Sequence, residues 1–305
     1  MFALSILIFL FINYLVLNME RREFLKFMGL GAILGAEIYL SHRLGYFSEK
    51  KKIYSNFSVD VEPLDYGLDE GMSAMSEIFL LSKKYEIPVT FFITDDIPSS
   101  IIEELPEYGS VQIHGHHVCA MEPDFSKRRL SDNEIADSIR TTRNNIRDCL
   151  GSKYNVCAMR FPGHRIPYDI VPLLEREGIT IDSSVAEATY DYFKGAPNTP
   201  YYASRKDIRK KGNSNVLEIP VSSFFNFSFS DGCFSKNDSY WIEIVTRLFS
   251  MRYDVITSYI HSWESKAIKN LDEWLGWVYS EYDVTHLTQP ELKSHLDKKI
   301  IRYNL

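Results

Sequence analysis

The chain has 305 residues, of which 45% are hydrophobic and 25% charged, so it is an ordinary globular protein with room for one large domain or two small ones. Its 34 basic and 41 acidic residues give a formal net charge of -7, which argues against a surface that binds nucleic acid. The four cysteines form no CxxC pair and are too few for a disulfide scaffold, so they neither establish an oxidising compartment nor indicate a cysteine zinc site.

Two apolar runs at the amino terminus predict an export signal or membrane anchor within residues 1–45. Residues Phe2 to Leu17 carry no charge and are slightly short for a membrane span of about 20 residues. Arg21 and Arg22 then precede a second apolar run, Phe27 to Leu40, and this order resembles a twin-arginine export signal. Because a positive flank stays on the cytoplasmic side of an apolar run, the rest of the chain is expected outside the cytoplasm.

Some features of this segment have more than one interpretation. Met19 is an alternative start of the protein, and a plain signal anchor with coincidental arginines is an alternative to the twin-arginine signal. Glu37 interrupts the second apolar run and no A-x-A cleavage site follows, which favours an anchored over a released protein. Residues 46–52 are interpreted as a solvated linker, and residues 53–305 as one folded domain.

From Ile53 onward, short apolar runs alternate with helical patterns, an order typical of βα units around a parallel sheet or barrel. The expected strands are Tyr54–Val59, Val89–Ile93, Val111–Ile113, Val156–Met159, Ile179–Ile181, Val216–Ile219 and Val255–Ile260. The expected helices are Met72–Tyr85, Ser131–Leu150, Tyr168–Glu177, Ser239–Met251 and one that starts near Pro290. The second of these helices has the clearest bounds, because Ser131 and Glu134 form a capping box and Gly151 is a stop signal.

Polar residues whose side chains could act in catalysis or metal binding follow five of the expected strands. They are Asp60, His114, Arg160, Asp182 and His261. The carboxyl ends of parallel strands in a barrel share one face, so residues 200 positions apart are expected to meet in one pocket. Strand ends are often polar because they are exposed, but that explains this mixture of carboxylate, imidazole and guanidinium less well.

Two short segments have the composition of a metal site. Asp60 and Glu62 lie two residues apart where the first strand ends, so their carboxylates point the same way if the strand continues. His114, His116 and His117 follow the third strand, around a glycine that allows a tight turn. A carboxylate with two imidazoles suits zinc or a similar divalent ion and leaves positions open for water and substrate.

Several motifs, in order over residues 53 to about 264, resemble those of the NodB-type polysaccharide deacetylases. They are Phe57-Ser58-Val59-Asp60-Val61-Glu62, Ile87-Pro88-Val89-Thr90-Phe91-Phe92-Ile93, Met159-Arg160-Phe161-Pro162-Gly163-His164-Arg165, Gly178-Ile179-Thr180-Ile181-Asp182-Ser183-Ser184, Glu218-Ile219-Pro220-Val221-Ser222 and Tyr259-Ile260-His261-Ser262-Trp263-Glu264. The resemblance implies a distorted (β/α) barrel of about seven parallel strands. It also implies a zinc-dependent or similar metal-dependent hydrolase that removes N-acetyl groups from a surface or cell-wall polysaccharide.

The same resemblance implies a role for each matching residue. Asp60 would be the catalytic base and His261 the general acid, while Glu62 and His114 would bind the metal. If Arg160 pairs with Asp60, it would lower the pKa of that carboxylate and orient it. One departure concerns the second metal histidine, because the family's H-x-x-x-H motif would place it at position 118, which is valine.

The other histidines in that segment are the substitutes. On a helical turn His117 lies near His114, since residues three apart are neighbours, so His117 is preferred over His116. Trp263 is expected to contact a sugar, and Asp182 either contributes to the site or caps the turn formed by the two serines after it. The alternative function is a catalytically silent carbohydrate-binding or scaffold protein. A third hypothesis is an enzyme that acts on another amide or on an ester.

Overall fold

The computed structural model describes residues 50–63, 71–115, 121–122, 126–128, 130–187, 191–224, 227–237 and 239–298. The expected export segment 1–45 and the histidines at 116 and 117 lie outside these residues. Within the described part of the chain, no helix combines the length and the apolar character required to cross a membrane.

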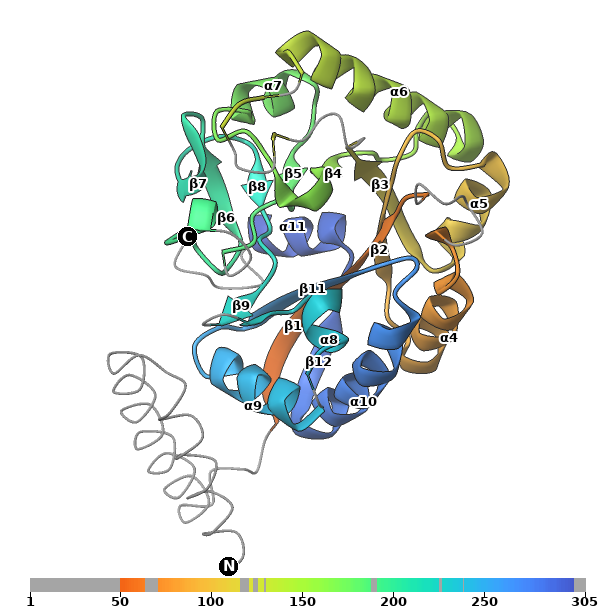
Figure 1. Cartoon of the computed structure of the whole chain (residues 1–305), viewed down its shortest axis with the longest axis vertical. Helices are drawn as coiled ribbons and strands as arrows, with labels where there is room; N and C mark the ends of the chain where they lie inside the picture. The colour runs from red at the N-terminus through yellow and green to blue at the C-terminus, as the bar shows by residue number, and fades with distance from the viewer. Residues whose placement is uncertain are drawn as a thin grey trace, which may run out of the picture. The chain divides into compact units, whose positions relative to one another are not determined.

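In the described part of the chain, seven parallel strands form one curved sheet in the order β11-β1-β2-β3-β4-β5-β8. Their bounds are β1 (Lys51–Val61), β2 (Val89–Ile93), β3 (Gly109–His114), β4 (Ala158–Arg160), β5 (Ile181–Asp182), β8 (Leu217–Glu218) and β11 (Val255–His261). Each overlaps a segment in which the sequence predicted a strand. The expected distorted (β/α) barrel is therefore confirmed (Figure 1).

The distortion of the barrel lies between β8 and β11, which are not neighbours in the described sheet. The chain after β8 approaches β11 through Ser222, whose backbone N donates to the carbonyl oxygen of Thr257 at 3.0 Å. The backbone N of Thr257 in turn donates to Oγ of Ser222 at 2.8 Å. Two hydrogen bonds between Ser222 and Thr257 thus join the chain after β8 to β11, where the two strands do not pair directly.

Shorter strands extend this framework. The antiparallel strands β6 (Tyr201–Ser204) and β7 (Asp207–Lys211) continue the sheet beyond β8, and β12 (Tyr282–His286) pairs with β1. A separate pair is formed by β9 (Ser223–Phe224) and β10 (Phe227–Ser228). None of these strands was predicted from the sequence.

Helices α4 (Met75–Tyr85), α5 (Ser99–Glu104), α6 (Asp132–Leu150) and α7 (Val171–Arg176) connect successive parallel strands and lie outside the sheet in Figure 1. The expected capping box of α6 is present, since Glu134 N donates to Ser131 Oγ at 3.4 Å and Ser131 N donates to Glu134 Oε2 at 2.8 Å. Gly151 follows α6 with a φ of 96°, a conformation that suits glycine. α7 is shorter than expected because Pro172 is tolerated only in a first turn, so the helix starts at Val171.

The remaining helices follow β10. They are α8 (Asp231–Phe234), α9 (Ser239–Ser250), α10 (Ser265–Glu281) and α11 (Gln289–Asp297). The sequence predicted α9 and α11 but not α8 or α10. Trp274 of α10 is buried and its indole Nε1 donates to Thr246 Oγ1 of α9 at 2.9 Å, so the two helices cover the core together.

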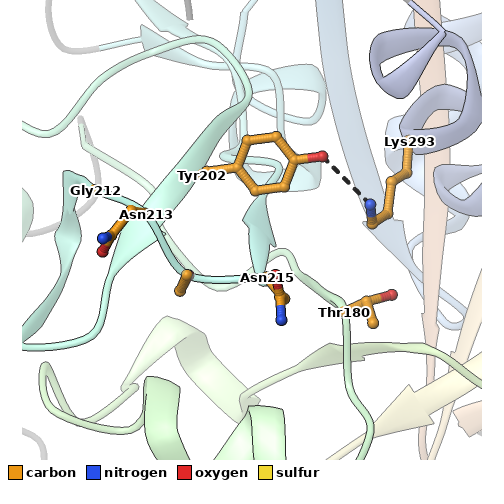
Figure 2. A pocket seen from close by; sticks show the side chains of 7 residues that line it. Thr180, Tyr202, Gly212, Asn213, Asn215 and Lys293 are labelled. Atoms are coloured by element: carbon orange, nitrogen blue, oxygen red, sulfur yellow. Dashed lines mark hydrogen bonds between the residues drawn. The ribbon is translucent and has the colours of Figure 1, made fainter.

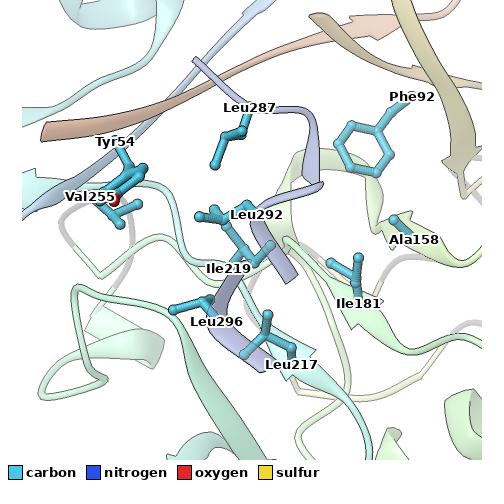
Figure 3. Packing of buried hydrophobic residues seen from close by; sticks show 10 residues of the cluster. All are labelled: Tyr54, Phe92, Ala158, Ile181, Leu217, Ile219, Val255, Leu287, Leu292 and Leu296. Carbon is cyan, nitrogen blue, oxygen red and sulfur yellow. The ribbon is translucent and has the colours of Figure 1, made fainter. Parts of the chain in front are cut away.

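α11 closes the barrel at the amino-terminal ends of its strands. Figure 3 shows Leu292 and Leu296 of this helix packed against strand side chains such as Ile181 and Val255. Leu287, just before the helix, is joined to the first half of β1, where its backbone N donates to Ser55 at 2.9 Å. Full burial of a leucine side chain contributes about 1.5–3 kcal/mol to the stability of the fold, so the apolar contacts of α11 stabilise this end of the barrel. The polar residues lie at the opposite end, where the strands finish.

Candidate active site

The residues that the sequence predicted for catalysis and metal binding lie at the carboxyl ends of neighbouring strands. In the parallel register, Asp60 of β1 is opposite His261 of β11, and His114 of β3 is opposite Arg160 of β4. A one-residue shift in either register would turn these side chains to the other face of the sheet. The strand pairing is therefore what brings residues 200 positions apart into one site.

Asp60 and Arg160 form a buried ion pair at the centre of the site. Arg160 Nη1 donates to Asp60 Oδ1 at 2.7 Å, and the two residues are 0% and 3% exposed. The pairing on which the predicted role of Arg160 depends is therefore present. A buried ion pair costs desolvation energy and is tolerated only when the remaining polar atoms are also hydrogen-bonded.

Arg160 meets that condition. Its Nε donates to the carbonyl oxygen of Ser183, and its Nη2 donates to the hydroxyls of Ser58 and Ser183, each at 2.9 Å. The guanidinium also lies over the rings of Phe92 and Tyr259, with its Cζ 4.5 and 4.9 Å from the two ring centroids. Arg160 is thus locked in place and acts on Asp60 rather than on a ligand.

The charge of Asp60 depends on this arrangement. Burial disfavours the charged carboxylate, but the positive charge of Arg160 and the contact with His114 outweigh it and hold the pKa of Asp60 below its usual range. Asp60 is therefore an ionised carboxylate, the form in which it accepts a proton.

His114 is oriented by its own loop. Its Nδ1 lies 2.9 Å from the carbonyl oxygen of Gly115, which only accepts, so Nδ1 carries the proton of that hydrogen bond. Nε2 then faces the carboxylates, 3.5 Å from Asp60 Oδ2 and 4.0 Å from Glu62 Oε2. Burial lowers the pKa of His114, but the two carboxylates more than offset this and raise it.

The donor set at this position fits a divalent metal ion. Glu62 Oε2 is buried without a hydrogen-bond partner in the described residues, and a buried carboxylate oxygen requires a partner. Two ligands that each lie about 2.1 Å from a tetrahedral ion are about 3.4 Å apart, and His114 Nε2 lies 4.0 Å from Glu62 Oε2. The described residues contain no complete group of three His, Cys, Asp or Glu ligands, and the predicted third ligand, His117, lies outside them.

His261 has a partner that the sequence did not identify. Its Nδ1 donates to Oδ2 of Asp231 at 2.6 Å, and Asp231 is the first residue of α8. Burial lowers the pKa of His261, but the hydrogen bond and the charge of Asp231 overcome this and raise it. Asp231 was missed because it lies 30 residues before the histidine on a four-residue helix, and a lone aspartate carries no spacing signal.

Trp263 lies beside the imidazole of His261. The two rings are stacked, with centroids 4.3 Å apart and planes inclined by 25°. The indole is half-buried, so part of its surface is available to a ligand. This position is consistent with the predicted contact to a sugar, which stacks its C–H surface on aromatic rings.

Asp182 takes the turn-capping arrangement that the sequence left open. Its Oδ1 accepts from Ser184 N and its Oδ2 accepts from Ser184 Oγ, both at 3.0 Å. The side chain is fully buried beside Glu218, and burial raises the pKa of Asp182 to about 6. With its oxygens held by Ser184 in this way, Asp182 shapes the turn next to Arg160, and its contact with substrate stays a prediction.

The segment after Arg160 has an unusual backbone. Gly163 and His164 both have a φ of 57°, which is uncommon for a residue with a side chain and is often found at functional sites. His164 is 4% exposed, its Nδ1 donates to the carbonyl oxygen of Ser184 at 3.1 Å, and burial lowers its pKa to about 4. This segment therefore places a neutral imidazole against Tyr259, in the wall of the site.

No family model matches the sequence, and no curated protein matches it significantly. Solved structures do match. A Mycobacterium smegmatis protein described as a polysaccharide deacetylase has a TM-score of 0.61 at 12% identity, over 84% of this chain and 94% of that one. A Pseudomonas aeruginosa protein with the same description has a TM-score of 0.58 at 12% identity, over 82% and 93%. The Puue allantoinase has a TM-score of 0.60 at 13% identity, over 85% and 94%.

Identities this low are evidence about architecture only. Fold alone does not imply function, and one of these neighbours is named for a substrate that is not a polysaccharide. The strand order, the curved parallel sheet and these likenesses agree with the family motifs identified in the sequence. The chain has the fold of the NodB-type polysaccharide deacetylases.

Proposed function

We propose that this protein is a metal-dependent hydrolase that removes N-acetyl groups from a surface or cell-wall polysaccharide. The observation that carries the proposal is the position of Asp60 opposite His261 on neighbouring strand ends, each held by a partner of opposite charge. Amide hydrolysis requires a base that takes a proton from water and an acid that protonates the departing amine. This pair supplies both.

Each partner keeps its residue in the protonation state that the reaction needs. Asp60 is ionised because Arg160 pairs with it, so it accepts the proton of the attacking water. His261 holds a proton more readily because Asp231 accepts from its Nδ1, which leaves Nε2 to donate to the amine. Arg160 and Asp231 are positioning residues that act through Asp60 and His261.

Glu62 and His114 would hold the metal ion, together with an imidazole from the segment after Gly115. When bound, the ion would polarise the acetamide carbonyl and stabilise the negative charge that develops on its oxygen. The unpartnered Oε2 of Glu62 and the orientation of His114 Nε2 toward it support this assignment. Zinc suits this mixture of imidazole and carboxylate ligands.

Acetate release decides between an active enzyme and a silent scaffold. The full-length protein should release acetate from at least one of a panel of N-acetylated glycans, and a chelator should remove the activity. Release of acetate from O-acetylated glycans alone would move the substrate from an amide to an ester. No release from either set, from protein that contains its metal, would favour the catalytically silent carbohydrate-binding protein.

Metal content tests the ligand assignment. His114→Ala and His117→Ala are each expected to lower metal occupancy strongly, because each removes one imidazole from the set. If the segment forms the predicted helical turn, His116→Ala should have a small effect, since residues two apart on a helix do not face each other. Elemental analysis of the three purified variants measures this. Loss of metal in His116→Ala with full occupancy in His117→Ala would reverse the assignment.

The pH dependence tests Asp231. Asp231→Asn removes the charge that raises the pKa of His261, so that pKa falls. The acid must be protonated to act, and the alkaline limb of the kcat/KM profile should therefore move to lower pH, with turnover at pH 7 reduced by about 10- to 100-fold. Trp263→Phe keeps a ring beside the imidazole and is the control. An alkaline limb at the wild-type pH would remove Asp231 from this role.

We also propose that the domain acts outside the cytoplasm, delivered by the segment 1–45 and anchored in the membrane or released. Arg21 and Arg22 before the second apolar run support this direction of export. Protease added to intact cells should digest the domain of the full-length protein, while a cytoplasmic marker survives. Protection of the domain until the membrane is broken would show the export hypothesis to be wrong.

A further inference from the structure

Two hollows in the described part of the chain lie away from the catalytic residues. The two hollows, of about 550 and 520 Å³, adjoin one another and share Thr180 and Lys293 in their walls. Both volumes lie in the range of about 300–1,000 Å³ that is usual for small-molecule sites. We call the two together the α11 groove, because α11 forms one wall of each.

The groove opens at the amino-terminal ends of the strands. Its walls contain Cys157, Thr180 and Asn215, which lie just before β4, β5 and β8. Arg160 of the active site lies at the carboxyl end of β4. In a barrel of parallel strands the two ends face opposite directions, so a ligand in the groove does not touch the catalytic residues.

The first hollow combines one aromatic ring and the ammonium group of Lys293 with several uncharged hydrogen-bonding groups. Figure 2 shows Tyr202 of β6 in the middle, with Asn213 and Asn215 from the loop between β7 and β8 around it. The Tyr202 hydroxyl donates to Asp297 and accepts from Lys293 Nζ at 3.3 Å, so the ring is fixed in place. The side chains of Asn213 and Asn215 are exposed and present amide donors and acceptors.

The second hollow carries positive charge. Four charged side chains line it, and Asp297 is already paired with Lys293 at 2.7 Å. Arg147 and Lys298 are not balanced by another carboxylate among the lining residues, and Nε of Arg147 is buried without a hydrogen-bond partner in the described part of the chain. An ammonium group in this hollow would therefore be repelled, whereas an uncharged ligand would not be.

We infer that the α11 groove binds a stretch of N-acetylated glycan as a second subsite of the domain. A fixed aromatic ring suits the C–H surface of a sugar, and the amides of Asn213 and Asn215 suit hydroxyl and acetamido groups. Deacetylation converts an acetamide into an ammonium group. The cations of the groove therefore favour binding of glycan that is still acetylated. The inference rests on the proposed function for the identity of the glycan.

The double variant Asn213→Ala/Asn215→Ala tests the groove without touching the catalytic residues. Loss of about one net hydrogen bond corresponds to roughly tenfold weaker binding, so the Kd of full-length protein for N-acetylglucosamine hexasaccharide should rise about tenfold. The wild type should bind the fully deacetylated hexasaccharide more weakly than the acetylated one. Lys206→Ala is the control, because Lys206 is exposed and lies in the turn between β6 and β7. It should leave the Kd for both hexasaccharides unchanged.

A kinetic measurement separates this inference from the proposed function. On a polymeric substrate the double variant should show a raised KM at unchanged kcat, and on a disaccharide it should match the wild type. Hexasaccharide binding that is equal in the wild type and the double variant, or stronger for the deacetylated form, would overturn the groove assignment even if acetate is released. Hexasaccharide binding that depends on Asn213 and Asn215, in a protein that releases no acetate, would support the groove assignment and contradict the proposed hydrolase function.

Discussion

Asp60→Asn is expected to lower acetate release by about a thousandfold, because general acid–base catalysis contributes about 10²–10⁴-fold to enzymatic rates. The asparagine keeps the size of the side chain and an oxygen for Arg160 Nη1, but it cannot take a proton from water. The lost charge on a buried hydrogen bond costs on the order of 2 kcal/mol, so the variant should fold with a lower Tm. Metal occupancy should stay near that of the wild type, since Glu62 and His114 remain.

Three measurements on one preparation check this expectation: acetate release, metal content and thermal unfolding. Ser58→Ala is the matched control, because it removes one hydrogen bond to Arg160 and leaves the carboxylate in place. It should retain most of the wild-type turnover. If Asp60→Asn also retained most of its turnover, another group would be the base.

Arg160→Ala is expected to have the largest effect on stability, about 3–5 kcal/mol, because it leaves the buried carboxylate of Asp60 without its cationic partner. Burial would then dominate the titration of Asp60, and its pKa would rise. The base must be ionised to act, so the acid limb of the kcat/KM profile should move to higher pH.

The stability of this variant should depend on pH in a defined direction. A carboxyl with a depressed pKa stabilises the native state above its unfolded pKa of about 3.9, and that contribution is lost as the pH falls toward the folded value. The difference in unfolding free energy between wild type and Arg160→Ala should therefore shrink as the pH is lowered through the raised pKa of Asp60 in the variant, and should continue to shrink below about 4. Urea unfolding at several pH values measures it.

Two further variants keep this test decisive. Arg160→Lys retains the charge with fewer donors and should shift the acid limb less than alanine does. Arg176→Ala removes an arginine that is half exposed and should shift neither the stability nor the pH profile appreciably. An acid limb that does not move in a folded Arg160 variant would leave Arg160 with a structural role only.

Local patterns in the chain were sufficient to predict the framework. All seven parallel strands and the capped helix α6 follow from periodicity, turn residues and capping, which depend on neighbours a few positions apart. A shared pocket for Asp60 and Arg160 was also anticipated, because both residues follow expected strands, and their ion pair lies in that position. Residue types at strand ends therefore identified the face of the barrel on which these side chains meet.

Contacts between distant segments could be read only from the tertiary structure. Asp231 reaches His261 because the chain before α8 pairs with β11 at Tyr259, and a single aspartate 30 residues away has no sequence signature. The α11 groove likewise depends on the β6–β7 hairpin, which the sequence did not predict, and on a carboxyl-terminal helix that returns to the amino-terminal ends of the strands. Periodicity and caps act over one or two turns of chain, whereas strand register and sheet curvature are set by packing over the whole domain, and it is these that decide which side chains meet.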